Sequence, residues 1–137
     1  MRKHASLIYA DMDGLKKIND TYGHNEGSLA ITKVAEILRQ TFRESDIIAR
    51  LGGDEFTILA TGIFPEKTNV VANRLEENLA NYNAEGNHQY DLSLSFGIIN
   101  IDPDNELSVE ELVAKADEAM YKHKRSRRKS LARRVEV

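Results

Sequence analysis

Two adjacent carboxylates beside a pair of glycines are the residues of this chain best suited to chemistry. Asp54 and Glu55 follow Gly52 and Gly53, and an apolar run lies on each side of the pentapeptide 52–56. Two short apolar runs joined by a Gly-Gly pair predict a β-hairpin with its turn at the glycines. Carboxylate oxygens suit Mg²⁺, and glycine amides can approach phosphates closely. The alternative is an acidic turn kept polar for solubility.

Three further segments accompany this hairpin. Residues 11–28 read Asp-Met-Asp-Gly-Leu-Lys-Lys-Ile-Asn-Asp-Thr-Tyr-Gly-His-Asn-Glu-Gly-Ser, residues 93–98 read Ser-Leu-Ser-Phe-Gly-Ile, and residues 116–124 read Ala-Asp-Glu-Ala-Met-Tyr-Lys-His-Lys. Together with the Gly-Gly-Asp-Glu-Phe pentapeptide they closely resemble the GGDEF family, the bacterial nucleotide cyclases usually called diguanylate cyclases. The resemblance runs from about Leu7 to about Lys129, which is nearly the whole chain.

The resemblance implies an enzyme that condenses two nucleoside triphosphates into a 3′,3′-cyclic dinucleotide and releases pyrophosphate. In this phosphoryl transfer a ribose 3′-hydroxyl attacks an α-phosphorus, and two Mg²⁺ or Mn²⁺ ions per active site would stabilise the reacting oxygens. By resemblance, the metal ligands are Asp11, Asp54 and the backbone carbonyl of Met12. Glu55 either joins these ligands or helps to deprotonate the hydroxyl, so Asp54 and Glu55 are the candidate catalytic residues.

The triphosphate also needs cations. The resemblance implies that Lys124 and Arg128 contact its phosphates, with Lys16 as a weaker candidate. The family usually has Ala-Lys-x-x-Gly-Arg-Asn in this region, whereas residues 123–129 of this chain read His-Lys-Arg-Ser-Arg-Arg-Lys. Because the glycine is missing, it stays open whether Arg127 or Arg128 reaches the nucleotide.

Base recognition is where this sequence departs most from the family pattern. By resemblance, Asn19 contacts guanine, and Leu15 replaces the usual Phe under the nucleotide. Ser28 stands where the motif Gly-His-x-x-Gly-Asp normally ends in Asp. A carboxylate there accepts bonds from the N1–H and amino donors of guanine, and a hydrogen bond to a charged group contributes about 1.5–3 kcal/mol.

A serine hydroxyl can donate or accept, so Ser28 should lose most of the discrimination against adenine. The change resembles the signature of the hybrid promiscuous (Hypr) GGDEF subgroup, which makes 3′,3′-cyclic GMP-AMP. We therefore expect GTP and ATP as substrates, and cyclic GMP-AMP as well as cyclic di-GMP as products. The alternatives are a strict diguanylate cyclase that uses only GTP and a degenerate module that binds nucleotide as a sensor.

A second motif has the spacing of the family's inhibitory site. Arg43 and Asp46 form an Arg-x-x-Asp tetrapeptide, and five residues separate Asp46 from Gly52. By resemblance, this pair binds the cyclic dinucleotide product away from catalysis, and Arg74 would complete the site. The alternative is a surface ion pair between residues three apart.

Hydrophobic periodicity predicts the elements that must position these residues. Residues 7–13 predict a strand that ends at Asp11 and Asp13, and we expect Asp13 to cap the helix that follows. Ser108 opens a capping box. The remaining expected elements are helices over 15–22, 26–42, about 70–79 and 108 to about 124, the hairpin over 47–61, and a strand over 90–101.

This order, βααββαβα, predicts an α+β fold with helices packed on a mostly antiparallel sheet. The resemblance narrows the expectation to the ferredoxin-like palm of nucleotidyl cyclases. Asp11 and Asp54 can converge on one metal site only if the first strand and the hairpin are neighbours in that sheet.

The composition fits one soluble globular domain. The chain has 137 residues, of which 41% are hydrophobic and 30% charged, and it has no cysteine, which excludes disulfides and thiolate metal sites. With no apolar run long enough for a membrane span and no signal peptide, we expect a cytoplasmic protein without membrane contact. Residues 122–134 hold eight of the nineteen basic residues, but no aromatic residues alternate with them, so we expect no nucleic-acid binding.

We expect residues 1–137 to form a single catalytic domain, a fragment of a longer signalling protein whose sensory part is not recoverable from this sequence. Each protomer would hold one triphosphate. Catalysis therefore requires a homodimer in which two protomers face each other.

Overall fold

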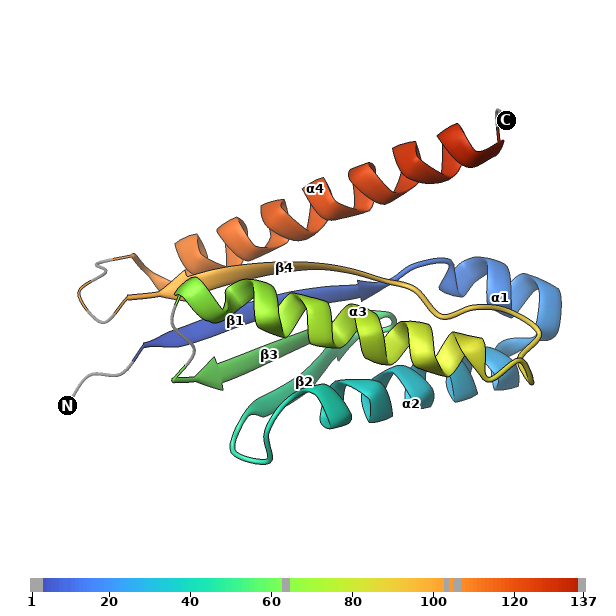
Figure 1. Cartoon of the computed structure of the whole chain (residues 1–137), viewed down its shortest axis with the longest axis horizontal. Helices are drawn as coiled ribbons and strands as arrows, with labels where there is room; N and C mark the ends of the chain where they lie inside the picture. Colours follow the sequence, from blue (N-terminus) through green and yellow to red (C-terminus); the bar gives the residue numbers. More distant parts are fainter. Residues whose placement is uncertain (1–3, 63–64, 103, 105–106, 136–137) are drawn as a thin grey trace.

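The computed structural model describes residues 4–62, 65–102, 104 and 107–135, with side chains described as far as residue 126. Strands and helices follow one another in the predicted α+β order (Figure 1). In chain order the elements are β1 (Ala5–Met12), α1 (Leu15–Tyr22), α2 (His24–Thr41), β2 (Ile47–Gly52), β3 (Glu55–Thr61), the short 3-10 turn η1 (Pro65–Lys67), α3 (Thr68–Ala84), β4 (Leu94–Ile101) and α4 (Val109–Val135).

The four strands form one antiparallel sheet in the order β2-β3-β1-β4. β1 lies in the interior of the sheet because it pairs with β3 on one side and β4 on the other. Alternate residues of β1 are buried, which is the pattern of a strand whose two faces have different environments. The expected fold class is therefore confirmed.

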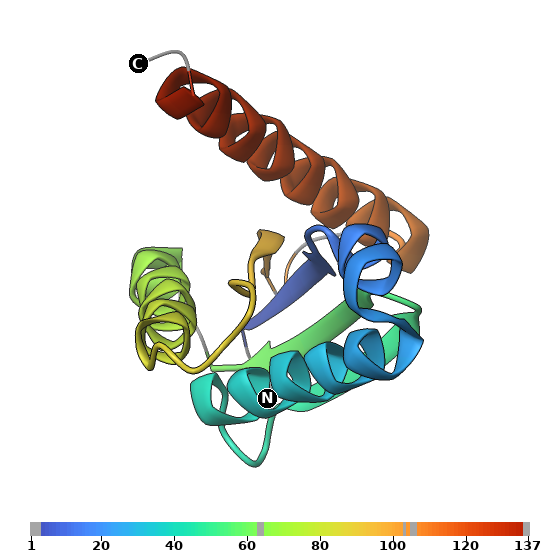
Figure 2. The same ribbon diagram turned by 90° about the vertical axis from the view of Figure 1, so that its right-hand side faces the viewer.

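One hydrophobic core fixes the sheet to α1, α2 and α3. Figure 2 shows α2 and α3 on one side of the sheet and α4 on the other. The apolar positions of α2 recur at helical spacing, so one face of the helix is buried against the strands. Fully or almost fully buried members of this core include Ile8, Met12, Val34, Leu38, Ile58, Leu75, Leu79 and Leu94.

Several element boundaries differ from the sequence-based expectation, among them the start of β4 and the end of α4. β4 begins at Leu94, although the alternation predicted a strand from residue 90. The Asn83 side chain explains this difference: it accepts a hydrogen bond from the Leu92 backbone N–H (2.8 Å) and donates one to the Leu92 carbonyl (2.9 Å). These bonds satisfy the Leu92 backbone without a neighbouring strand.

The last helix is longer than predicted and ends at Val135 instead of near residue 124. Residues 109–135 contain neither glycine nor proline, and lysine, arginine and alanine are good helix formers. The predicted helix start is confirmed, because the Ser108 hydroxyl accepts the Glu111 backbone N–H at 3.1 Å. Within the described residues, no helix is long and apolar enough to cross a membrane.

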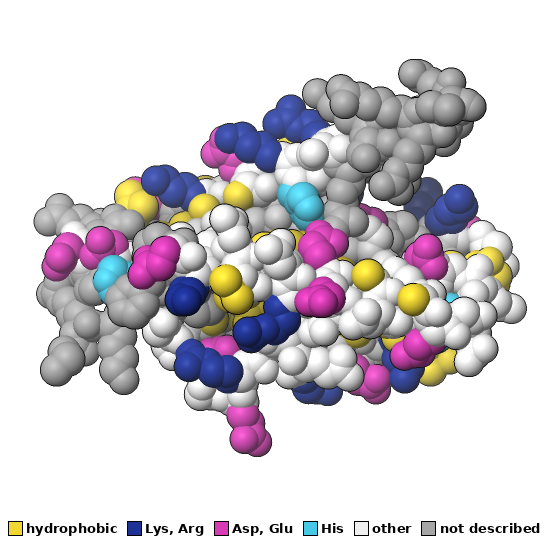
Figure 3. All heavy atoms as spheres, in the orientation of Figure 1, with side chains coloured by type: hydrophobic (Ala, Val, Ile, Leu, Met, Phe, Trp, Pro, Cys, Tyr) yellow, Lys and Arg dark blue, Asp and Glu magenta, His cyan; other side chains and the backbone are white. Residues whose placement is uncertain are grey.

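Gly97 allows α4 to pack directly on β4. A Cβ atom at this position would lie 2.4 Å from the Met120 backbone nitrogen and 2.7 Å from the Ala116 carbonyl oxygen, closer than real atoms approach. The helix backbone therefore rests on the strand backbone. Lys124 of α4 thereby reaches Asp11 at the C-terminal end of β1. Figure 3 shows basic side chains along the described part of α4, at the upper edge of the molecule.

Candidate active site

The candidate site lies where the end of β1 meets the β2–β3 hairpin. In the β1–β3 register Asp11 is opposite Glu55, and the Met12 backbone N–H donates a 2.8 Å hydrogen bond to the Asp54 carbonyl. The first strand and the hairpin are thus neighbours, which was the condition for Asp11 and Asp54 to converge. The sheet brings together acids that are 43 positions apart in the sequence.

Asp11 is buried, with 7% of its surface exposed, and its charge is balanced by α4. The Lys124 ammonium lies 2.8 Å from Asp11 Oδ2, across 113 positions of sequence. Burial raises the pKa of Asp11, the Lys124 ammonium opposes that rise, and the neighbouring Asp54 carboxyl adds to it. Two acids crowded at a buried edge favour the binding of a cation.

The residues at this edge fit a divalent cation that arrives with phosphates. Asp11 Oδ1 is buried and has no hydrogen-bond partner among the described residues, so a metal could satisfy it. In the described part of the chain, no three Asp, Glu or His side chains form a preformed metal cluster. Mg²⁺ is usually held by one or two carboxylates plus substrate phosphates, and two acids with the Met12 carbonyl match a site of that kind.

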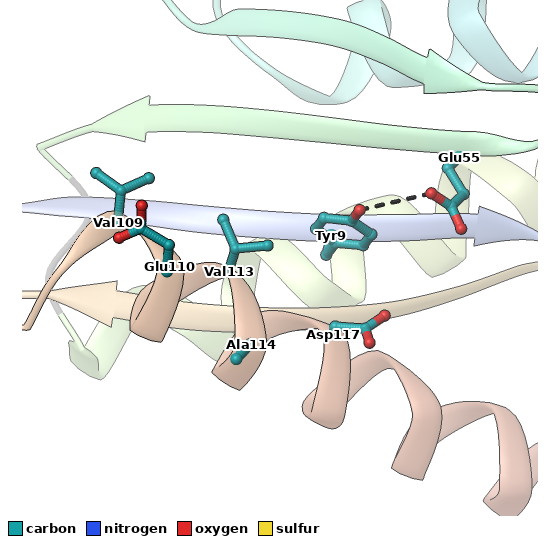
Figure 4. A pocket seen from close by; sticks show the side chains of 7 residues that line it. All are labelled: Tyr9, Glu55, Val109, Glu110, Val113, Ala114 and Asp117. Carbon is teal, nitrogen blue, oxygen red and sulfur yellow. Dashed lines mark hydrogen bonds between the residues drawn. The ribbon is translucent and has the colours of Figure 1, made fainter.

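Glu55 is partly exposed and lines a hollow of about 510 Å³ between the hairpin and α4. Figure 4 shows the Tyr9 hydroxyl directed at Glu55, with Asp117 of α4 nearby. The Tyr9 hydroxyl donates to Glu55 Oε2 over 3.5 Å. Burial and the carboxylates of Glu55 and Asp117 raise the pKa of Tyr9, so its phenol remains a hydrogen-bond donor.

Arg50 organises the hairpin turn, a role that the sequence analysis missed. Its Nε atom donates to the carbonyls of Gly52 and Gly53, each over 3.2 Å, and its terminal nitrogen donates to Gly53 over 2.9 Å. These bonds hold the glycine carbonyls at the irregular end of the β2–β3 pairing. An arginine two residues before a Gly-Gly turn is the signal that could have indicated this role.

The prediction that Asp13 caps α1 is wrong. The residue at the N-cap is Gly14, in the left-handed conformation with φ 75°, and no side chain caps the helix. The Asp13 carboxylate instead accepts the hydroxyls of Ser93 and Ser95, each over 2.7 Å. Asp13 thereby joins the end of β1 to the start of β4, next to the candidate metal ligands.

Of the predicted base-binding residues, Asn19 and Ser28 lie where α1 meets α2, and Leu15 is at the start of α1. A Cβ atom at Gly27 would be 1.7 Å from Asn19 Oδ1, so the Asn19 side chain lies directly on the glycine at the start of α2. Ser28 follows on the same turn and is exposed. Leu15 opens α1 and packs against the core. A side chain at position 27 would therefore displace the Asn19 side chain from its present place.

The predicted phosphate-binding residues have different outcomes. Lys124 reaches the acids of the site, as described above, whereas Lys16 is exposed on the first turn of α1. The side chains of Arg127 and Arg128 lie outside the described residues. Of the predicted cations whose side chains are described, Lys124 contacts a candidate metal ligand, Asp11.

Arg43 and Asp46 form a local pair at the end of α2. Asp46 accepts the Arg43 backbone N–H over 2.9 Å, and the Arg43 guanidinium lies 3.6 Å from the other Asp46 oxygen. The same guanidinium donates to the Thr61 carbonyl. Arg74 is exposed on α3. This geometry contains the surface ion pair that was the alternative to a product-binding site.

A family model described as "Diguanylate cyclase, GGDEF domain" matches residues 1–130. The chain belongs to the GGDEF family. It is 37% identical over 116 residues to the bifunctional diguanylate cyclase/cyclic di-GMP phosphodiesterase MucR of Pseudomonas aeruginosa, a match that covers 85% of this chain and 17% of MucR. It is 34% identical over 126 residues to the probable diguanylate cyclase DgcT of Escherichia coli, covering 89% of this chain and 27% of DgcT.

Solved GGDEF domains share the fold. The GGDEF domain of TpbB (YfiN) from Pseudomonas aeruginosa matches with a TM-score of 0.78 and 31% identity, over 91% of this chain and 73% of that one. The GGDEF domain of DgcB from Caulobacter crescentus, solved in complex with c-di-GMP, matches with a TM-score of 0.76 and 27% identity, over 90% and 74% of the two chains. The GGDEF domain described here therefore has the family's antiparallel sheet flanked by helices.

The two serines that hold Asp13 can be tested by their effect on stability. Ser95 is fully buried and donates to a charged acceptor, so Ser95→Ala should lower the free energy of unfolding by about 1.5–3 kcal/mol. Ser6→Ala is the matched control, because Ser6 is equally buried but donates to the neutral Asn100 amide over 3.0 Å. Urea denaturation followed by circular dichroism measures both, and an equal or smaller loss for Ser95→Ala would contradict the role given to Asp13.

Proposed function

We propose that this GGDEF domain is a dinucleotide cyclase, which condenses two nucleoside triphosphates into a cyclic dinucleotide and releases pyrophosphate. The observation that carries this proposal is the meeting of Asp11 and Asp54 at one edge of the sheet, with Lys124 held 2.8 Å from Asp11. The curated relatives are named as diguanylate cyclases, which supports GTP as the substrate and cyclic di-GMP as the product. Because the chain spans 17% and 27% of these two relatives, the activity stays a proposal.

The residues of the site have separate tasks in this proposal. Asp11, Asp54 and the Met12 carbonyl would hold two Mg²⁺ or Mn²⁺ ions, which activate a hydroxyl and neutralise developing charge when bound. Glu55 would join them or accept the proton of the ribose 3′-hydroxyl. Lys124 would exchange its contact with Asp11 for the triphosphate, because a flexible ammonium can follow the larger negative charge.

Further cations and a second protomer complete the proposal. Lys16 on the first turn of α1 and Arg128, or Arg127 in its place, are the remaining candidates for the phosphates. Each protomer would supply one triphosphate, so two protomers must face each other during the reaction. Residues 1–137 would act as the catalytic module of a longer signalling protein.

A second candidate function, relaxed base choice, is favoured by Ser28. A carboxylate that could pair with guanine is missing at this position, and Glu26, the acid on the same turn, is engaged elsewhere. Its Oε1 atom accepts the Tyr90 hydroxyl over 2.8 Å. In this candidate function the domain would take GTP and ATP and make cyclic GMP-AMP beside cyclic di-GMP, with Asn19 and Leu15 contributing less to the choice. The names of the relatives favour the GTP-only alternative.

We propose in addition that Arg43, Asp46 and Arg74 bind the cyclic dinucleotide product and slow the enzyme. The Arg43 side chain is 60% exposed, so its guanidinium is accessible to a ligand, and arginine suits two-point contact with phosphate. The solved DgcB complex with c-di-GMP supports product binding by a domain of this fold.

Asp54→Ala should abolish most product formation without unfolding the domain. Asp54 is partly exposed at the hairpin tip, so its loss removes a metal ligand and little buried contact. Product formation from GTP and Mg²⁺, followed by mass spectrometry, should fall by several orders of magnitude. Asp91→Ala, an exposed acid outside the site, is the control. A folded Asp54→Ala protein with near-parent activity would exclude the metal assignment and favour a different nucleotide chemistry.

Arg43→Ala should weaken binding of cyclic di-GMP and relieve product inhibition, because the guanidinium would no longer reach phosphate. Calorimetry with purified cyclic di-GMP measures the affinity directly. Arg39→Ala is the matched control, an exposed arginine in the last turn of α2. Equal affinity in the parent and Arg43→Ala proteins would leave Arg43 and Asp46 as a surface ion pair.

Ser28→Asp should restore a strong preference for GTP if the domain accepts both purines. The restored carboxylate would pair with guanine donors and face a lone pair on adenine, so the product should shift towards cyclic di-GMP by about 10- to 150-fold. The measurement is the product ratio at equal GTP and ATP concentrations. Cyclic di-GMP as the sole product of the parent, unchanged by Ser28→Asp, would leave a strict diguanylate cyclase.

A further inference from the structure

We propose that His123 is a positioning residue that fixes Lys124 at the candidate active site. This inference rests on the proposed contact of Lys124 with the triphosphate. His123 immediately precedes Lys124 on α4, in a position where the family's usual pattern has alanine. Its imidazole links α4 to β4 and to α3.

Phe96 and Glu76 both contact the His123 ring. The Phe96 backbone N–H donates to His123 Nδ1 over 2.9 Å. The ring of Phe96 lies 4.7 Å from the imidazole, centroid to centroid, and His123 Nε2 is 3.8 Å from the Glu76 carboxylate on α3. Because Nδ1 accepts a hydrogen bond, the proton of the neutral ring is on Nε2, on the side that faces Glu76.

The sheet register explains how this anchor acts on Lys124. Phe96 lies opposite Ala10 in the β1–β4 pairing, and Asp11 lies opposite Ser95. The Phe96 N–H that anchors His123 and the Asp11 carboxylate that binds Lys124 are therefore one register step apart on adjacent strands. Their separation is set by the hydrogen bonds of the sheet.

Consecutive helical residues project about 100° apart, so His123 and Lys124 can reach two different strands at once. His123 attaches α4 to β4, and Lys124 reaches across to Asp11 on β1. The absent side chain of Gly97 lets the helix lie close enough for both contacts. The two side chains together determine where α4 presents its ammonium.

Without an acceptor at position 123, the Phe96 N–H would lose its partner and α4 would lose its attachment at this level of the sheet. The lost bond is worth about 0.5–1.5 kcal/mol, which corresponds to roughly a 2- to 12-fold change. We expect triphosphate affinity to fall and KM to rise by that factor, because Lys124 would no longer be held beside Asp11.

Two amide substitutions at position 123 distinguish the effect of the hydrogen-bond acceptor from the effect of the size of the imidazole ring. Asparagine can place its Oδ1 atom where His123 has Nδ1, whereas the glutamine amide lies one carbon farther from the backbone. Binding of a fluorescent GTP analogue with Mg²⁺ should therefore be close to the parent in His123→Asn and about 2- to 12-fold weaker in His123→Gln. Lys122→Ala is the control, because this exposed neighbour pairs with Glu118 on the solvent side of α4.

A double-mutant cycle distinguishes positioning of Lys124 from general support of the fold. Lys124→Ala should weaken binding, and adding His123→Gln to Lys124→Ala should cause no further loss. If Lys124→Ala binds the analogue as tightly as the parent, the proposed phosphate role of Lys124 fails. If Lys124→Ala is weak but His123→Gln binds like the parent, or lowers the affinity equally in both backgrounds, the positioning role of His123 is wrong.

Discussion

The antiparallel pairing of β1 with β3 is the constraint on which the rest of the site depends. It sets Asp11 opposite Glu55 and brings the Asp54 carbonyl to the Met12 N–H. A slip of one residue would turn Asp11 towards the opposite face of the sheet, away from α4. The buried apolar residues of β1 prevent such a slip, because it would expose Ile8 and Ala10 in place of their partly exposed neighbours. The hydrophobic pattern that folds the sheet therefore also aligns the acids.

This alignment buries a carboxylate at the end of β1, and α4 supplies the cation that balances its charge. A buried carboxylate is costly unless it is paired, and Asp11 has a second acid beside it. Lys124 pairs with Asp11 from the far end of the chain, and Gly97 and His123 keep α4 close enough for that contact. The charge balance of the site consequently depends on the packing of α4 against the sheet. Nucleotide and metal would replace the ammonium at the acids while keeping the charges balanced.

Local signals in the sequence predicted the elements, and the structure differs from those predictions where partners from distant segments intervene. Two short apolar runs joined by a Gly-Gly pair predicted the hairpin and the acids at its tip. Asp13 carries a local N-cap signal, but its carboxylate instead accepts hydrogen bonds from the hydroxyls of Ser93, just before β4, and Ser95 in β4. Residues 90–93 alternate in hydrophobicity like a strand, yet the Asn83 side chain forms hydrogen bonds with both the N–H and the carbonyl of Leu92. The roles of Arg50 and His123 depend on carbonyl and amide groups that only the folded chain brings within reach.

The most direct test of this account is metal binding at the acids, measured without catalysis. Mn²⁺ can be titrated into the protein with a non-hydrolysable GTP analogue and followed by electron paramagnetic resonance, for the parent, Asp11→Asn and the exposed control Glu118→Gln. We expect Mn²⁺ binding by the parent and the control, and an affinity for Mn²⁺ that is about tenfold or more lower in Asp11→Asn. Loss of a residue that merely supports a metal ligand already lowers metal affinity by about tenfold, and loss of the ligand itself should cost at least as much. Equal Mn²⁺ affinity in the parent and Asp11→Asn would contradict the claim that the β1–β3 pairing builds a metal–nucleotide site.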